Sequence, residues 1–242
     1  MSSLQEKSTI LITGAAGRIG TFLSQHLALD YHLRYLDIQP IPNIDDVIVI
    51  DITDFEAVLK AMDSVDIVIH LAANPSINQP WQDVYTSGIS GTYNVFEAAR
   101  QAGVQKIIYA STSHVSAGWE KKQQELLTPE MPIRPDCLYG VGKAFGEILG
   151  RFFAEQYDIC VICLRIGVFI PQPKSENLED RSLSIWCSPQ DLAQLVTSCL
   201  KCKNLGFQIF YAVSNNTRRF FDISNAEELL GYKPQDNIEE LL

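Results

Sequence analysis

Basic residues are scarce in this chain of 242 residues, and long apolar runs are missing. Nineteen Lys and Arg face 29 Asp and Glu, which gives a formal net charge of −10. This balance argues against a nucleic acid partner, because such a partner needs a basic surface. No stretch has the length and apolar character of a membrane span, and residues 1–7 lack the apolar core of a signal peptide. We therefore expect a soluble cytoplasmic protein with no membrane or nucleic acid partner.

Two cysteine pairs have the Cys-x-x-Cys spacing of zinc sites, Cys160 with Cys163 and Cys199 with Cys202. The first pair lies in a β-branched apolar run, where residues i and i+3 face opposite sides of a strand. The second pair ends an amphipathic helix. Zinc requires its sulfur ligands to converge on one point. The sequence therefore predicts buried free thiols in a reducing compartment, and no metal site.

Strand and helix patterns alternate along most of the chain. Expected strands cover 9–13, 33–37, 46–51, 66–71, 106–111 and 159–165, and expected helices cover 18–30, 55–62, 81–102 and 137–157. This alternation is typical of an α/β fold with a doubly wound parallel sheet. After residue 165 we expect a loop over 171–181, a helix from 188 or 189 to 202, a strand over 207–213 and a helix over 225–230. We predict a Rossmann core over 1–165 and a small C-terminal substrate cap over 166–242 within the same compact domain.

A glycine-rich turn follows the first strand and opens the first helix. Gly14 permits a tight turn, Gly17 lets backbone approach a pyrophosphate, and Gly20 lets the helix pack closely on the strand. The backbone N–H groups at the start of this helix, which include those of Arg18 and Ile19, favour phosphate oxygens. A plain strand–turn–helix connection is the alternative interpretation.

Asp37 ends the second strand, 23 residues after Gly14. A carboxylate at this position accepts both ribose hydroxyls of NAD and repels the 2′-phosphate of NADP. The next residue is Ile38, so no positive charge follows to hold that phosphate. NAD is therefore the predicted cofactor. Asp51, which closes the third strand, could accept from the adenine amine or could instead cap the following helix.

Tyr139 and Lys143 lie four residues apart and share one face of an expected helix. An ammonium beside a phenol favours the phenolate and lowers the pKa of the phenol. Such a phenol can take the proton of a substrate hydroxyl while hydride leaves the adjacent carbon. The segment Ser111–His114 ends the fifth strand at the edge where ligands bind such sheets. Its hydroxyls could bind a substrate oxygen or could simply cap the strand end.

These motifs together resemble those of the extended short-chain dehydrogenases/reductases. Residues 134–147, around Tyr139, resemble the active-site helix of uronate dehydrogenases, and residues 164–167, 181–186, 215–222 and 230–236 also fit. The resemblance covers nearly the whole chain. It implies NAD-dependent oxidation of the anomeric carbon of galacturonate or glucuronate to an aldarolactone, by a homodimer or higher homo-oligomer.

The resemblance also implies a role for each matching position. Tyr139 would be the base, Lys143 would bind the nicotinamide ribose, and Thr112 would supply the catalytic hydroxyl. Arg181 would hold the sugar carboxylate, unless it forms an ion pair with a nearby acid. The other expected sugar contacts are Ser76, Ser113 and His114. The expected cofactor contacts are Gly14, Gly17, Arg18, Ile19, Gly20, Asp37, Asp51, Ile52, Leu71, Ala72, Ala73, Tyr139, Lys143 and Ile166.

The chain departs from the uronate dehydrogenase pattern at three positions. Ser113 and Gly88 stand where asparagine is usual, and Val168 stands where a serine is expected. Two other functions stay open. A nucleotide-sugar epimerase or dehydratase shares the core chemistry but usually needs a larger C-terminal region, and a non-catalytic NAD-binding protein would tolerate Gly88.

Overall fold

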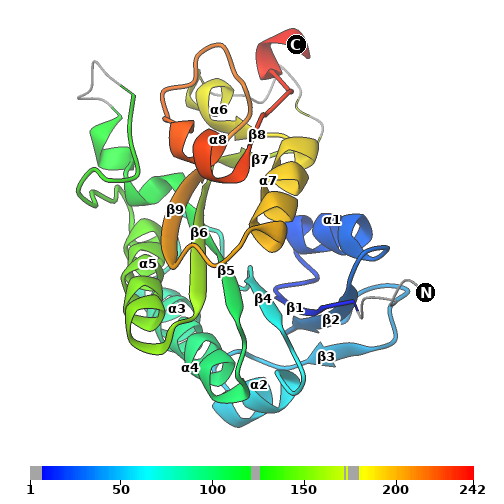
Figure 1. The fold of residues 1–242 in the computed structure, drawn as a ribbon. Coiled ribbons are helices and arrows are strands. Elements are labelled where there is room, and N and C mark those ends of the chain that lie inside the picture. The colour runs from blue at the N-terminus through cyan, green and yellow to red at the C-terminus, as the bar shows by residue number, and fades with distance from the viewer. Residues whose placement is uncertain (1–6, 121–125, 172, 174–179) are drawn as a thin grey trace.

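The computed structural model describes residues 7–120, 126–171, 173 and 180–242. Seven strands form one parallel sheet (Figure 1). They are β1 (Thr9–Thr13), β2 (His32–Asp37), β3 (Val47–Val49), β4 (Ile67–His70), β5 (Lys106–Thr112), β6 (Cys160–Ile166) and β9 (Phe207–Ala212). Their order across the sheet is β3-β2-β1-β4-β5-β6-β9. The order reverses between β1 and β4, which makes the crevice at their carboxyl ends the expected ligand site. The predicted doubly wound parallel sheet is confirmed.

Helices cover both faces of this sheet. The helices are α1 (Arg18–Leu27), α2 (Phe55–Ala61), α3 (Trp81–Asp83), α4 (Thr92–Ala102), α5 (Leu138–Tyr157), α6 (Asp180–Ile185), α7 (Pro189–Lys201) and α8 (Ser224–Leu230). α1 and α7 pack on one face, and α2, α4 and α5 pack on the other (Figure 1). None of the helices in the described part of the chain has both the length and the apolar character that a bilayer crossing demands.

Each strand sends alternate side chains into two apolar layers. Ile10 packs with α1 on one face, while Leu11 packs with the helices of the other. Cys160 belongs to the first layer and Cys163 to the second, so the predicted opposite orientation of this pair is confirmed. Both are buried free thiols, as predicted, and so is Cys199, but Cys202 at the end of α7 is a free thiol that is only half-buried.

The expected helix over 81–102 is divided into three segments. Between α3 and α4 lies η1 (Val84–Gly91), which has the wider π-helical turn. The hydroxyls of Thr86 and Ser87 donate to the carbonyls of Gln82 and Asp83, at 2.8 and 2.9 Å. Such bonds back to residue i−4 loosen a helix, and the glycines of η1 add backbone freedom. A pattern of apolar spacing does not reveal this change of pitch.

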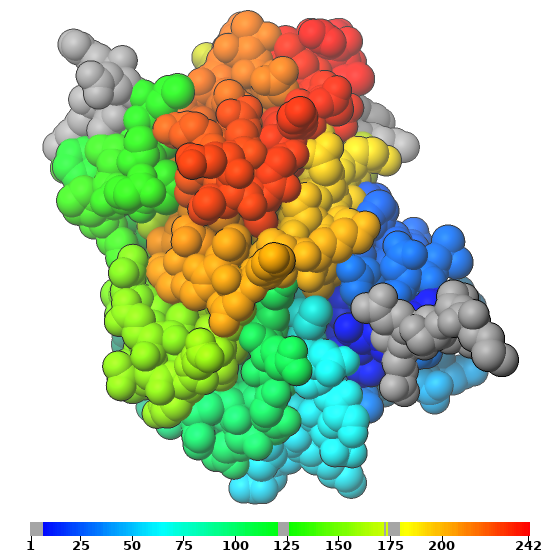
Figure 2. Space-filling model, viewed as in Figure 1, coloured from blue at the N-terminus to red at the C-terminus, as the bar shows by residue number. Residues whose placement is uncertain are grey.

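The last third of the chain differs from the sequence expectation in two places. α6 begins at Asp180 inside the expected loop 171–181, of which residues 172 and 174–179 lie outside the described chain. A small second sheet pairs β7 (Val168–Phe169) with β8 (Trp186–Cys187). Two-residue strands are too short to produce an alternation pattern. In the space-filling view this third of the chain, coloured yellow to red, lies against the green and blue segments (Figure 2).

Three glycines set the close approach of α5 to its neighbours. A Cβ atom at Gly142 would lie 3.0 Å from Val84 Cγ1, and one at Gly150 would lie 2.9 Å from Val161 Cγ1. A Cβ atom at Gly146 would collide with the ring and hydroxyl of Tyr109 on β5. Real Cβ atoms need more room than this, so α5 lies closer to the sheet than a helix with larger residues could.

Candidate active site

The glycine turn connects β1 to α1 and packs against the residues that follow β4. Gly14 has φ of 72°, and a Cβ atom there would lie 2.6 Å from the backbone nitrogen of Ala72. A Cβ atom at Gly20 would lie 2.7 Å from Ala15 Cα. Glycine is therefore required at both positions, for the turn conformation at Gly14 and for helix packing at Gly20. The structure thus brings Gly14 beside Leu71 and Ala72, two other expected cofactor contacts.

The start of α1 can receive phosphate groups. Gly17 is its N-cap, and no side chain of the described residues accepts from the first-turn N–H groups there. Gly17 and Arg18 are exposed, so a ligand can reach this helix end. Backbone N–H groups at an uncapped, accessible helix start favour anions. The predicted role of this turn fits the structure.

Asp37 links the end of β2 to the glycine turn. Its Oδ2 accepts from the backbone N–H of Ala16 at 2.9 Å, and its Oδ1 accepts from that of Gln39 at 3.1 Å. Each carboxylate oxygen keeps a second lone pair. The half-buried carboxylate can therefore still accept from ribose hydroxyls, as an NAD site requires.

Asp51 and Ile52 lie between β3 and α2. Asp51 is exposed, and its Oδ1 accepts from Thr53 at 2.8 Å. Asp54 is the N-cap of α2, since its side chain accepts from the N–H of Ala57, so the capping role considered for Asp51 is wrong. Ile52 is buried at 4% exposure and packs under η1.

The three expected catalytic residues converge at the end of β5. The Thr112 side chain lies near the Tyr139 hydroxyl and acts to lower the pKa of that phenol. Lys143 Nζ donates to the carbonyl of Ala110 at 2.7 Å and lies 5.9 Å from the centre of the Tyr139 ring. Ile166 pairs with Thr112 across the β5–β6 register. A phenol, a hydroxyl and an ammonium thus lie close together at the end of β5.

Burial controls the ionisation of both members of the Tyr/Lys pair. It raises the pKa of Tyr139 to about 12, and it lowers the pKa of Lys143 to about 8. The sequence predicts that Lys143 lowers the pKa of Tyr139. This prediction is wrong, because the pKa of Tyr139 is raised. The reason is geometric, because the Lys143 ammonium faces the Ala110 carbonyl and the Tyr109 ring, whose centre is 4.9 Å away.

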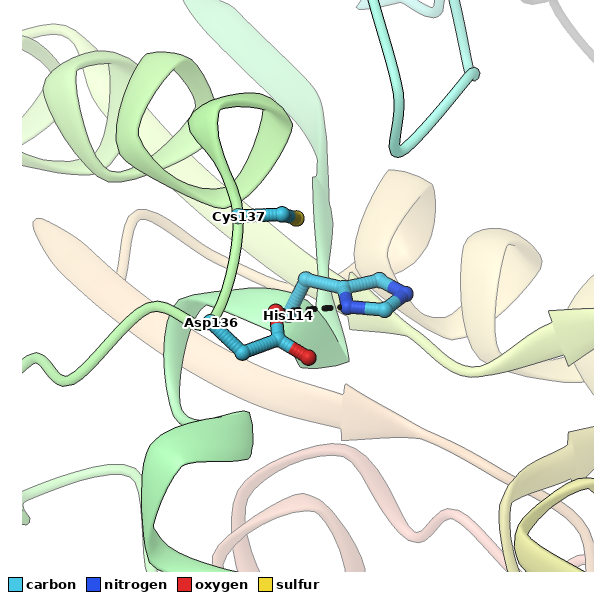
Figure 3. Close-up of side chains that lie close together, drawn as sticks. All are labelled: His114, Asp136 and Cys137. Carbon is cyan, nitrogen blue, oxygen red and sulfur yellow. Dashed lines mark hydrogen bonds and ion pairs between the residues drawn. The ribbon is translucent and has the colours of Figure 1, made fainter.

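His114, Asp136 and Cys137 lie close together (Figure 3). The centre of the His114 ring is 6.3 Å from that of Tyr139. His114 Nδ1 lies 2.8 Å from Asp136 Oδ1. Although burial raises the pKa of Asp136, the hydrogen bond from His114 holds it below its ordinary value. When Nδ1 donates to a carboxylate, Nε2 carries a lone pair that can accept from a sugar hydroxyl. His114 is thus oriented for the contact that the sequence assigned to it.

Among the described residues, these three form the group that could hold a metal ion, with their ligand atoms within 4.8 Å of one another. The observed hydrogen bonds already account for the cluster. Cys137 is the N-cap of α5, and its sulfur accepts from the N–H of Gly140 at 3.5 Å.

Arg181 reaches the same crevice but already has an acidic partner. Its Nε and Nη2 lie 2.6 and 2.8 Å from the two carboxylate oxygens of Glu120, and Nη2 also lies 3.3 Å from Ser113 Oγ. The ion pair considered as an alternative for Arg181 is therefore present. Glu120 was missed by the sequence analysis, since a lone acid in a polar segment gives no signal. Ser76 lies in an exposed turn, where its hydroxyl accepts from Asn78 N–H at 3.3 Å.

Gly88 lines a small cavity that also touches Tyr139 and Lys143. A Cβ atom at Gly88 would have its nearest neighbours at 3.9 Å, so a larger side chain could begin here without collision. This departure from the family pattern therefore lies beside Tyr139 and Lys143. A wider hollow between α1 and α7, lined in part by His26 and Lys201, holds none of the predicted site residues.

A buried ion pair holds α5 in place behind the site. Arg165 on β6 donates to both oxygens of Glu147 at 2.9 and 2.8 Å, and the two side chains are at most 2% exposed. Ser111 donates to Glu147 at 2.5 Å, and Arg165 donates to the hydroxyl of Tyr211 on β9 at 3.2 Å. The helix that carries Tyr139 and Lys143 is thus tied to three strands.

The fold and this site define a class of protein. A parallel sheet with a glycine turn at its reversal point, an acid at the end of β2 and a Tyr/Lys pair beside a hydroxyl belongs to an NAD-binding enzyme of the short-chain dehydrogenase/reductase type. The sequence pattern of the NAD dependent epimerase/dehydratase family matches residues 10–186. The chain belongs to this family.

Similar proteins agree with this assignment. The chain is 37% identical to an NAD-dependent glucose-6-phosphate dehydrogenase of Haloferax volcanii, over 96% of this chain and 94% of that protein. It is 35% identical to a uronate dehydrogenase of Pseudomonas putida, over 95% and 85% of the two chains. A solved structure of a uronate dehydrogenase variant from Agrobacterium tumefaciens, complexed with NAD, has a TM-score of 0.87 and 31% identity, and the match covers 97% of this chain and 87% of that one. The predicted resemblance and the predicted NAD cofactor are confirmed.

Proposed function

We propose that this protein oxidises the anomeric carbon of a hexuronic acid, galacturonate or glucuronate, to an aldarolactone. The convergence of Tyr139, Thr112 and Lys143 at the carboxyl edge of the sheet carries the proposal. The uronate dehydrogenases among its relatives support the choice of substrate.

In this function Thr112 and Tyr139 hold the anomeric hydroxyl of the sugar between them. Tyr139 takes the hydroxyl proton as the carbon–oxygen double bond of the lactone forms, and the carbon loses a hydride. NAD, when bound by the glycine turn and Asp37, supplies the hydride acceptor. Burial of the Tyr139 side chain raises the pKa of its phenol and so opposes its ionisation. The Thr112 hydroxyl is the group that favours the phenolate during proton transfer.

The sugar hydroxyls and carboxylate meet the other polar side chains of the crevice. His114, fixed by Asp136, can accept from one hydroxyl through Nε2. Ser113 lies between Thr112 and Arg181, and Arg181 supplies the positive charge for the carboxylate. Ser76 is assigned its sugar contact only by the resemblance.

The direct test is the appearance of NADH with galacturonate and glucuronate, compared with neutral aldoses. We expect Tyr139→Phe to lower kcat by about 10²- to 10⁴-fold while NAD affinity, measured by fluorescence titration, stays unchanged. Tyr157→Phe, at the exposed end of α5, is the matched control and should retain full activity. A Tyr139→Phe variant as active as the wild type would show that Tyr139 is not the base.

A second candidate substrate is an aldose phosphate oxidised at the same carbon. A relative named for glucose 6-phosphate shares 37% identity with this chain, and Arg181 could face a phosphate as well as a carboxylate. Glucose 6-phosphate therefore belongs in the same substrate panel. Turnover of a nucleotide sugar without net NADH would instead favour an epimerase.

We also propose a cytoplasmic homo-oligomer that pairs through α4 and α5. Three large apolar side chains on these helices are 47 to 61% exposed, namely Tyr93, Ile148 and Phe152. Exposed apolar side chains on one helix pair fit an interface between two copies. The six free cysteines are consistent with a reducing compartment. Light scattering of the purified protein measures the number of subunits.

A further inference from the structure

We propose that Glu120 determines substrate specificity by competing with the sugar carboxylate for Arg181. This inference rests on the proposed function, in which Arg181 receives that carboxylate. It adds a residue that tunes how strongly the site prefers an acidic sugar over a neutral one.

The geometry of the pair is that of a carboxylate bound to its receptor. Two nitrogens of Arg181 meet the two oxygens of Glu120 at 2.6 and 2.8 Å, so Glu120 occupies one full edge of the guanidinium. This is the bidentate arrangement that a substrate carboxylate would itself adopt. Glu120 therefore occupies the edge of the Arg181 guanidinium that would bind the sugar carboxylate most strongly.

The pair is partly shielded from water and lies beside Ser113 at the end of β5. The Glu120 side chain is 12% exposed and that of Arg181 is 29% exposed. Arg181 also contacts Ser113, the residue that follows Thr112. A charge pair at this depth is screened less than a surface pair, so its effect on an incoming ion is larger.

The charges around Arg181 do not favour another anion. Arg181 already has Glu120 as its partner, and its field also helps to lower the pKa of Asp136. Glu120 thus neutralises Arg181, and Asp136, whose direct partner is His114, adds a second carboxylate within the field of Arg181. A uronate must either displace Glu120 or bind the remaining edge of the guanidinium, where the nearby carboxylates repel it. Neither effect weakens the binding of a neutral aldose.

Removing the charge of Glu120 while keeping its shape tests this competition. We expect Glu120→Gln to tighten galacturonate binding by about tenfold, the size of one desolvated charged contact. The affinity for galactose should change by less than about twofold, because galactose has no carboxylate. Calorimetric titration of the NADH complex with each sugar measures both affinities without turnover.

Three further variants make the result specific. Glu155→Gln, in an exposed ion pair on α5, is the matched control and should leave both affinities unchanged. Glu120→Ala repeats the test with the acid removed entirely. In an Arg181→Ala background, Glu120→Gln should no longer tighten galacturonate binding, because the two changes act through one contact.

The proposal is overturned if galacturonate binds Glu120→Gln as weakly as the wild type, less tightly, or not measurably. It is also overturned if the gain persists without Arg181, since the effect would then come from general charge and not from competition. NADH formation is recorded separately. If Glu120→Gln binds galacturonate more tightly but no variant oxidises it, the proposed function fails while the competition stands.

Discussion

Replacing Lys143 with methionine should make the protein more stable while it abolishes activity. Lys143 is 4% exposed on α5, and burial lowers its pKa from 10.5 to about 8. In the unfolded chain the ammonium returns to water and its pKa to about 10.4. The folded protein therefore holds a charge that would be more stable in water, and a methionine of similar length would not carry this penalty.

The magnitude follows from the shift of about 2.5 pKa units, at 1.36 kcal/mol for each unit. The penalty is about 3 kcal/mol when Lys143 is fully charged. Methionine also loses the hydrogen bond to the Ala110 carbonyl, which offsets about 1 kcal/mol of the gain. We expect Lys143→Met to raise the free energy of unfolding at pH 7 by about 2 kcal/mol.

The pH dependence gives the sign of the effect. Below about pH 8 both the folded and the unfolded wild type keep this proton, and the penalty is fully present. Between about pH 8 and 10.4 the unfolded state binds more protons, so wild-type stability rises with pH. The advantage of Lys143→Met should therefore shrink by about 2 kcal/mol between pH 7 and pH 9.5.

Urea unfolding followed by circular dichroism at pH 7 and pH 9.5 measures both quantities. Lys60→Met, on the exposed surface of α2, is the matched control and should show no such pH dependence. NADH formation by Lys143→Met should fall to background. A variant that is less stable at both pH values, or whose stability difference does not change with pH, would refute the reasoning.

Two further predictions concern the turn and the buried ion pair. Gly14→Ala should cost about 1–3 kcal/mol of stability and weaken NAD binding, because of its φ of 72° and the contact with Ala72. Gly103→Ala, with φ of 77° but open space around its Cβ, is the control for thermal unfolding and NAD titration, and an unchanged NAD affinity in Gly14→Ala would contradict the assigned role. Glu147→Gln should destabilise by about 3–5 kcal/mol, because it leaves Arg165 charged and buried without its ion-pair partner. Thermal unfolding checks this change, and a loss no greater than that of Glu155→Gln would argue against it.

The sheet and the main catalytic residues could be predicted because their signals are local. Each strand of the core is a short apolar run, and parallel strands end at a common edge, so the positions of Gly14, Asp37 and the segment Ser111–His114 predict one shared crevice, while the resemblance singles out Thr112. The spacing of Tyr139 and Lys143 places them on one helix face. In the same way, the three-residue spacing of the Cys160 pair predicts opposite faces of β6.

Other features depend on contacts that the sequence does not specify. Glu120 lies 61 residues from Arg181 along the chain, and neither residue indicates the other. The pKa of Tyr139 depends on its burial and on the direction in which the Lys143 ammonium points, which only the packing against Ala110 decides. The pitch of η1 depends on hydroxyl bonds of Thr86 and Ser87 that compete with the backbone.

The glycines along α5 make the turnover of this enzyme sensitive to substitutions at positions that do not contact the substrate. Gly146 is seven residues beyond Tyr139 on the same rigid helix, about two turns away. One added methyl at Gly146 would push the helix off the Tyr109 ring. The Tyr139 phenol, which α5 carries, would then move away from Thr112 together with the helix. Substitutions on the hidden side of α5 should therefore reduce turnover in a protein whose ligand-binding groups are all intact.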